Sequence, residues 1–127
     1  MEYTKTLKEN FLNPKNMGKI KNPDATAEIG NPACGDIMKI YLKIDKKTKI
    51  IKEIKFETFG CAAAIATSSM LTQLAKKRTI EKAKKITIND IEKKLGGLPN
   101  IKVHCAKMSI ESLKKALKNY EEKTTSS

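Results

Sequence analysis

The stretch "DIMKIYLKIDKKTKIIKEIKFETFG", residues 36–60, decides the fold because hydrophobic and polar residues alternate on both sides of a polar turn. Met38, Ile40, Leu42 and Ile44 share one face in the first half, and Ile54 and Phe56 share one face in the second. The opposite faces carry mostly lysine, glutamate and Tyr41. This pattern predicts two antiparallel strands with one buried and one wet face.

The residues before and after this hairpin predict further elements. Segment 25–31 can be extended up to Asn31, because a following proline disfavours helix. Near the start, Tyr3, Leu7 and Phe11 have helical spacing. The alanine-rich stretch after Gly60 predicts a helix that packs in the core.

The second half of the chain predicts short helical pieces and one long helix. Thr87 and Asp90 have the spacing of a capping box, and Gly96-Gly97 predicts a stop. The last helix has an apolar face made of Ala106, Ile110, Leu113, Leu117 and Tyr120. At 127 residues, the chain predicts a single domain, 1–127, with a short flexible tail at about 122–127.

Composition and charge narrow the classes of function. The net charge is +12, but Arg78 is the one arginine among 26 basic residues, aromatic residues are 5%, and tryptophan is absent. Nucleic-acid sites favour arginine and aromatic platforms, so we expect no nucleic-acid partner. No apolar run approaches the about 18 residues of a membrane span, and the first residues lack a secretory signal. We therefore expect a cytoplasmic protein with no membrane partner.

The three cysteines all fall at predicted element boundaries, in the contexts "NPACGD" (31–36), "FGCAAA" (59–64) and "KVHCAK" (102–107). Cys34 lies in a loop, Cys61 lies at a helix start, and Cys105 lies at or just inside the start of the last helix, and the partial positive charge of a helix start favours a thiolate. Their spacing is far longer than the two to four residues of a zinc-finger ligand pair. Two alternatives stay open: a site assembled by the tertiary fold, or thiols buried separately as small apolar groups.

Two other side chains are candidate ligands beside the thiols. Asp36 follows Cys34 by two residues and His104 precedes Cys105, and both types bind metals. Asp36 is equally compatible with a turn residue that bonds to local N–H groups, and His104 with a packed imidazole.

Taken together, these segments resemble the iron–sulfur cluster assembly scaffold family, the IscU type that also forms the amino-terminal part of NifU proteins. The resemblance extends from Tyr3 and "NPKNMG" (13–18) through "NPACGD", "FGCAAAIATSS" and "GGLPNIKVHC" (96–105) to the last helix. It implies an α+β fold in which a small three-stranded antiparallel sheet packs against helices. It also implies a scaffold and carrier, not an enzyme.

The family resemblance further implies roles for individual residues. Cys34, Cys61 and Cys105 would hold a nascent [2Fe-2S] cluster built from iron, with Asp36 or His104 near the fourth position. A cysteine desulfurase of the IscS/NifS type would deliver persulfide sulfur, with Cys105 as the acceptor, and recipient apo-proteins would take the finished cluster. Lys102 would lie close to the site. Zinc is an alternative occupant of the cluster-free form, because it accepts the same donors.

One segment departs from the family pattern. Many members carry Leu-Pro-Pro-Val-Lys, which an Hsp70-type chaperone recognises, whereas this chain has "LPNIK" at 98–102. Loss of the second proline weakens the extended conformation and with it the expectation of chaperone recognition. The additional domains of long NifU proteins are not expected here, and both a monomer and a homodimer are compatible with the sequence.

Overall fold

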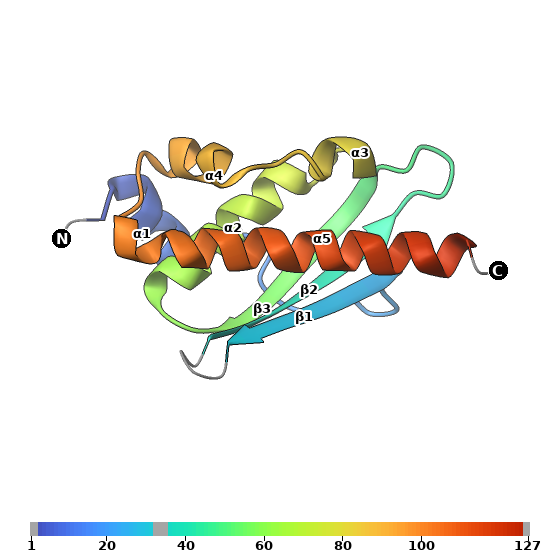
Figure 1. Ribbon diagram of the computed structural model, residues 1–127, viewed down its shortest axis with the longest axis horizontal. Helices are drawn as coiled ribbons and strands as arrows, with labels where there is room; N and C mark the ends of the chain where they lie inside the picture. Colours follow the sequence, from blue (N-terminus) through green and yellow to red (C-terminus); the bar gives the residue numbers. More distant parts are fainter. Residues whose placement is uncertain (1–2, 32–35, 126–127) are drawn as a thin grey trace.

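A three-stranded antiparallel sheet forms one layer of the molecule (Figure 1). The computed structural model describes residues 3–31 and 36–125. The sheet contains β1 (Ala25–Asn31), β2 (Asp36–Ile44) and β3 (Ile51–Phe59), in the order β1-β2-β3. In the register, Ile40 lies opposite Ala27 on β1 and Phe56 on β3. The strands expected from the alternating pattern are confirmed.

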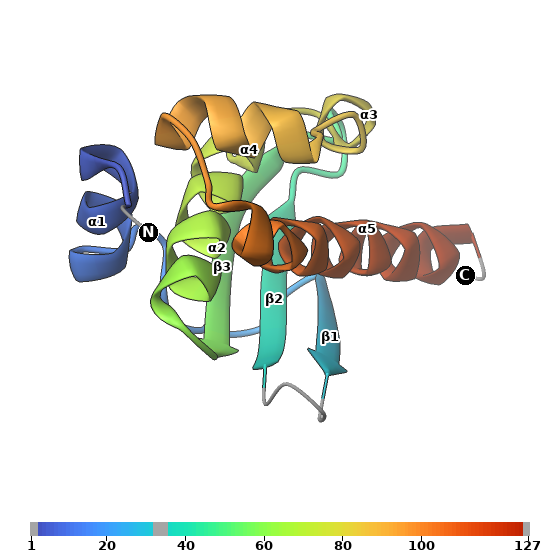
Figure 2. The same cartoon turned by 60° about the vertical axis from the view of Figure 1, so that its left-hand side comes forward.

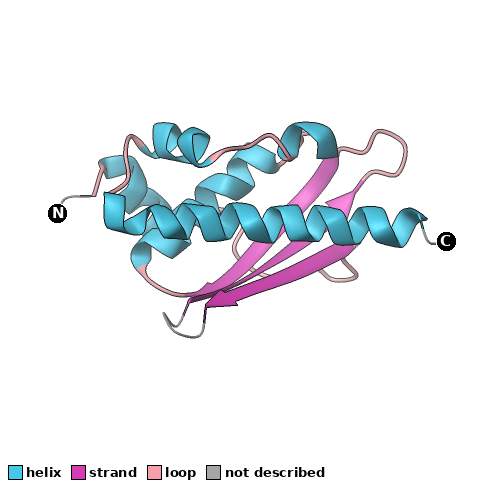
Figure 3. Ribbon diagram, viewed as in Figure 1, coloured by secondary structure: helices cyan, strands magenta, loops and turns pink. Residues whose placement is uncertain are grey.

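The helices form a second layer over one face of the sheet (Figures 2 and 3). They are α1 (Lys5–Leu12), α2 (Ala62–Ala75), α3 (Ile80–Ala83), α4 (Ile88–Leu95), the short 3₁₀ helix η1 (Asn100–Lys102) and α5 (Val103–Thr125). Helices α2 and α5 cover the sheet, α1 packs against α2, and α4 contacts both α2 and α5. The expected α+β architecture is therefore confirmed.

The core lies between the sheet and the helices. It is formed by fully buried apolar side chains of β2 and β3 together with those of α2 and α5, among them Met38, Ile40, Leu42, Ile54, Phe56, Leu71, Leu113 and Leu117. All five residues of the expected apolar face of the last helix are buried. None of the helices in the described part of the chain has the length and apolar character needed to cross a membrane.

The outer face of the sheet is polar but not uniformly exposed. Tyr41, expected on the wet face, is only 5% exposed there. Its hydroxyl donates a hydrogen bond to Glu57, and the ammonium group of Lys39 lies 5.2 Å from its ring centroid. Burial and the neighbouring carboxylate raise the pKa of Tyr41 to about 12. Long charged side chains therefore cover an aromatic ring on the solvent side.

Two local predictions for the helices have different outcomes. The capping box of Thr87 and Asp90 is present, and α4 ends at Gly96 with φ 79° in the left-handed region. In contrast, Phe11 is 38% exposed, although it has helical spacing with Leu7, which is fully buried in the core. Polar groups also hold α1, because Ser69 Oγ and Gln73 Nε2 both donate to Asn10 Oδ1 at 2.7 Å.

The free edge of β1 is partly covered by side chains of α5. Lys115 Nζ donates to the carbonyl of Glu28 at 3.1 Å, and Asn119 Nδ2 donates to the carbonyl of Thr26 at 2.9 Å. Helix α5 continues through residues 122–125 of the predicted flexible tail as far as Thr125, and residues 126–127 lie outside the described part.

Candidate functional site

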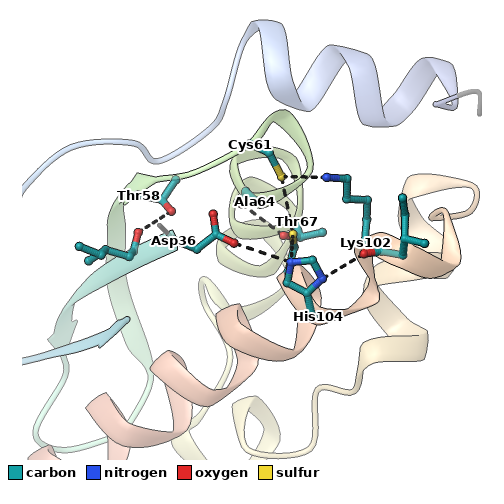
Figure 4. Close-up of polar contacts among 10 residues, drawn as sticks. Asp36, Thr58, Cys61, Ala64, Thr67, Lys102 and His104 are labelled. Carbon is teal, nitrogen blue, oxygen red and sulfur yellow. Dashed lines mark hydrogen bonds and ion pairs between the residues drawn. The ribbon is translucent and has the colours of Figure 1, made fainter. Parts of the chain in front are cut away.

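Four of the five predicted metal ligands lie close together, and Figure 4 shows three of them, Asp36, Cys61 and His104. Asp36 begins β2, Cys61 caps the start of α2, and His104 and Cys105 lie in the first turn of α5. Cys61 Sγ is 3.8 Å from Cys105 Sγ. Cys34, the fifth candidate, lies outside the described residues. For the described candidates, the fold brings the groups together, and the alternative of two separately buried thiols does not hold.

Cys61 is positioned by the abrupt change from strand to helix. Strand β3 ends at Phe59, and Cys61 keeps an extended backbone (φ −80°, ψ 174°) before the helix begins at Ala62. Gly60 leaves room in this geometry, because a Cβ atom there would lie 2.6 Å from Asp36 Oδ1 and 3.1 Å from the Cβ of Ala64. Its missing side chain therefore allows the Asp36 carboxylate to lie against the junction.

His104 and Cys105 are positioned by the turn before α5. His104 Nδ1 lies 3.0 Å from the carbonyl oxygen of Ile101. With Nδ1 protonated and donating to that carbonyl, Nε2 presents its lone pair to the site. Nε2 is 3.6 Å from Cys105 Sγ and 3.7 Å from Asp36 Oδ2.

The Cys61 thiol lies in an environment that favours its charged form. Burial on its own raises the pKa of Cys61, but the N–H groups of Ala64 and Ala63, the contact with Cys105 and the charge of Lys102 together lower it below its ordinary value. Lys102 Nζ is 3.7 Å from Cys61 Sγ (Figure 4). The sulfur in turn raises the pKa of Lys102. The prediction of a thiolate-favouring position is confirmed for Cys61.

Cys105 differs from Cys61, and the prediction of the same electrostatic setting for both is wrong. Cys105 has no exposed surface, and burial followed by the neighbouring charge of Cys61 raises its pKa. It lies inside the first turn of α5 instead of at its cap, packed against Ala63 and Ala64. The two thiols therefore differ in exposure and in the direction of their pKa shifts, although their sulfur atoms are in contact.

Three donor side chains lie close enough together to be candidate ligands of one metal ion. Asp36, His104 and Cys105 each offer one ligand atom, and these atoms all lie within 4.8 Å of one another. Two ligand atoms that each lie about 2.0–2.3 Å from one zinc ion are less than 4.8 Å apart, so a small inward movement of the three side chains suffices to bind an ion. The contact between Cys105 and Cys61 adds a second thiol next to the group. A mixed set of oxygen, nitrogen and sulfur donors fits iron or zinc.

Several residues around the site were not identified from the sequence. A cavity of about 290 Å³ is lined by Ile29, Gly30, Asp36, His104, Lys107, Met108 and Glu111. Ile37, Phe59 and Ile101 are 42%, 77% and 63% exposed. We call these three exposed side chains the apolar rim, and each is next to Asp36, Gly60 or Lys102 in the chain. Their nearness in sequence to the candidate residues is the signal that could have revealed them.

The difference between the thiols predicts which one is alkylated first. With iodoacetamide at pH 7 we expect Cys61 to react roughly tenfold or more faster than Cys105, because it is partly exposed and its pKa is lowered. As the pH rises, the rate at Cys61 should level off first, whereas the rate at Cys105 should continue to increase because its pKa is raised. Peptide mass spectrometry after timed quenching measures both rates. Equal rates at pH 7 would contradict the assignment.

Comparisons with known proteins identify the family of the chain. The NifU-like N terminal domain model matches residues 2–127. The iron–sulfur cluster assembly scaffold protein IscU 1 of Archaeoglobus fulgidus is 49% identical over 118 residues, which are 93% of this chain and 76% of that protein. IscU of Aquifex aeolicus is 42% identical over 119 residues, 94% of this chain and 76% of that protein.

A solved structure gives the same result for the fold. The N-terminal part of a NifU-like protein from Brucella abortus superposes with a TM-score of 0.77 at 19% identity, covering 94% of each chain. This likeness supports the arrangement of sheet and helices. Because the family model matches nearly the whole sequence and close relatives share the same description, the chain belongs to the NifU-like N-terminal domain family, the family of IscU-type scaffolds.

Proposed function

We propose that the chain is a scaffold on which a [2Fe-2S] cluster is assembled and from which it is transferred to apo-proteins. The observation that carries this proposal is the contact of two thiols from separate elements, Cys61 and Cys105, beside Asp36 and His104. The cluster is cargo, so the protein acts as a carrier. The description of its relatives as iron–sulfur cluster assembly scaffold proteins supports the same function.

In this proposal each candidate residue has a role toward the cargo. Cys34, Cys61 and Cys105 supply thiolates to the iron atoms, and Asp36 or His104 supplies the remaining ligand. A carboxylate or imidazole holds iron less firmly than a fourth thiolate, so the cluster stays exchangeable. Lys102 places a positive charge beside Cys61, which offsets the negative charge of the thiolates.

The proposed partners supply sulfur and receive the product. A cysteine desulfurase delivers persulfide sulfur, of which Cys105 is the final acceptor. The exposed side chains of the apolar rim, which adjoin Asp36, Gly60 and Lys102 in the chain, favour docking of the desulfurase over the site. Free thiols must stay reduced, which favours the cytoplasm as the working compartment. "LPNIK" gives no support for an Hsp70-type chaperone.

Anaerobic reconstitution tests the function. The chain is incubated with ferrous iron, L-cysteine and a cysteine desulfurase, visible absorption is recorded, and the product is mixed with an apo-ferredoxin. We expect a coloured protein whose cluster moves to the ferredoxin. A colourless protein that retains zinc and donates nothing would overturn the proposal and leave a zinc-binding protein, which the Asp36, His104 and Cys105 donors also fit.

Asp36→Ala tests the role of the carboxylate in release. Asp36 is 7% exposed and lies beside His104, so its removal leaves a site dominated by thiolates and imidazole. We expect the bound cluster to persist longer and to transfer several-fold more slowly to apo-ferredoxin, because an exchangeable ligand is lost. Stopped-flow absorption measures the transfer rate. Glu111→Ala removes another carboxylate that lines the adjoining cavity and is the matched control, and equal rates in Asp36→Ala and this control would refute the role.

A further inference from the structure

The final sulfur acceptor of the proposed function has no exposed surface. Cys105 is 0% exposed and is packed against Ala63 and Ala64 of α2. A persulfide on another protein must bring its outer sulfur into bonding contact with the accepting sulfur. In this conformation the Cys105 sulfur therefore cannot be reached directly from solvent.

Cys61 offers the sulfur a route to Cys105. It is partly exposed at the start of α2, and its sulfur contacts Cys105 Sγ at 3.8 Å. An outer sulfur bonded to Cys61 at about 2.05 Å would lie next to Cys105 Sγ, and a small separation of the two thiols lets Cys105 attack it. On the solvent side, Lys102 Nζ lies 3.7 Å from Cys61 Sγ and attracts an anionic donor sulfur.

We infer that Cys61 is the entry thiol of a two-step sulfur relay: it accepts the sulfane sulfur from the desulfurase and passes it to the buried Cys105. The inference rests on the proposed function, because it takes the desulfurase as the sulfur donor. It adds a transfer role to a residue otherwise assigned only as a ligand.

The relay is balanced without any external oxidant or reductant. In the first step the Cys61 thiolate attacks the outer sulfur of the donor persulfide, and the donor leaves as a thiolate. In the second step Cys105 Sγ bonds to that sulfur while its bond to Cys61 Sγ breaks, and the electron pair returns to Cys61 as a thiolate. The sulfane sulfur keeps its oxidation state throughout.

Two neighbouring side chains accept the proton of Cys105 and stabilise the negative charge that forms on Cys61 in the second step. The proton of the Cys105 thiol moves to His104 Nε2, which lies 3.6 Å from Cys105 Sγ. The departing Cys61 thiolate remains beside the Lys102 ammonium group. A stabilised thiolate is the better leaving group, so this contact favours forward transfer from Cys61 to Cys105.

A timed labelling experiment tests the relay. The complete chain is mixed anaerobically with a cysteine desulfurase and L-cysteine, samples are quenched with a maleimide, and peptide mass spectrometry locates the added sulfur on each cysteine. In the wild-type chain we expect Cys61 to be labelled first and its label to decay while that on Cys105 rises. In Cys105→Ser the label should stay on Cys61.

Cys61→Ser provides the decisive variant. We expect loading of Cys105 to slow about tenfold or more, because the adjacent thiol no longer presents the sulfur at high effective concentration. Circular dichroism checks that this variant is folded, and the wild-type time course does not depend on any variant. Loading of Cys105 at the wild-type rate in Cys61→Ser overturns the relay, and so does labelling of Cys105 or Cys34 before Cys61 in the wild-type chain.

A second sulfur source separates the relay from the proposed function. Sodium tetrasulfide replaces the desulfurase in an otherwise identical time course. If the desulfurase labels neither thiol, the proposed function fails. The tetrasulfide experiment then still tests the relay, which requires that Cys61 is labelled before Cys105. If the desulfurase labels Cys105 directly, the scaffold function stands and the relay fails.

Discussion

Cys105→Ala is expected to lower the affinity for ferrous iron by more than about 100-fold, beyond the roughly 10–100-fold effect of losing a residue that merely supports a ligand. The reason is geometric: Cys105 Sγ contacts both Cys61 Sγ and His104 Nε2, so it belongs to the thiol pair and to the mixed ligand set. Because buried cysteine packs as a small apolar group, the free energy of unfolding should fall by only about 1 kcal/mol.

Anaerobic calorimetric titration with ferrous iron measures the affinity, and urea denaturation measures the stability. Ser109→Ala is the matched control, because Ser109 lies one turn further along α5, is equally buried, and donates to Ala106 O at 2.8 Å. The control should bind iron like the wild-type chain. Iron affinity in Cys105→Ala within threefold of wild type would show that this sulfur is not a ligand.

Gly60→Ala is expected to lower the iron affinity about 10–100-fold although residue 60 offers no ligand atom. The added Cβ would lie 2.6 Å from Asp36 Oδ1 and 3.1 Å from the Cβ of Ala64, so the carboxylate must leave its present position beside His104 and Cys105. The new methyl group therefore disturbs the site by displacing a ligand and not by removing one.

The same iron titration measures this effect, with Gly30→Ala as the control. Gly30 lines the cavity beside the site, but a Cβ there would meet Ile37 Cγ1 at 3.4 Å, which the side chain can accommodate. We expect the control to keep an affinity within about twofold of wild type. A Gly60→Ala variant with undiminished affinity would show that Asp36 is not held against the junction in the metal-bound protein.

The elements predicted well from the sequence depend on local patterns. The alternation in residues 36–60 specifies the face of each strand, and the Thr87–Asp90 pair specifies a helix start, because the interacting residues are close in the chain. The exposure of Phe11 could not be predicted in this way. It depends on Asn10, Ser69 and Gln73, which hold α1 through polar contacts between distant segments.

The site was only partly predictable, because its properties also depend on contacts between residues that are distant in the chain. The contexts of the cysteines indicated Cys61 and Cys105, and the family resemblance indicated a shared site. The unlike properties of the two thiols depend on burial by α2 and on Lys102, which is distant from Cys61 in the chain. The need for glycine at position 60 arises from Asp36, which belongs to another strand.

The covered edge of β1 has a consequence for how the protein behaves at high concentration. A scaffold that shows an apolar rim to its partners already has one adhesive surface, and an open strand edge would add a template for stacking copies into fibrils. Lys115 and Asn119 occupy two edge carbonyls that an incoming strand would need. Helix α5 therefore disfavours the addition of a strand from another copy at β1. The residues of the proposed cluster site are not involved in these two contacts.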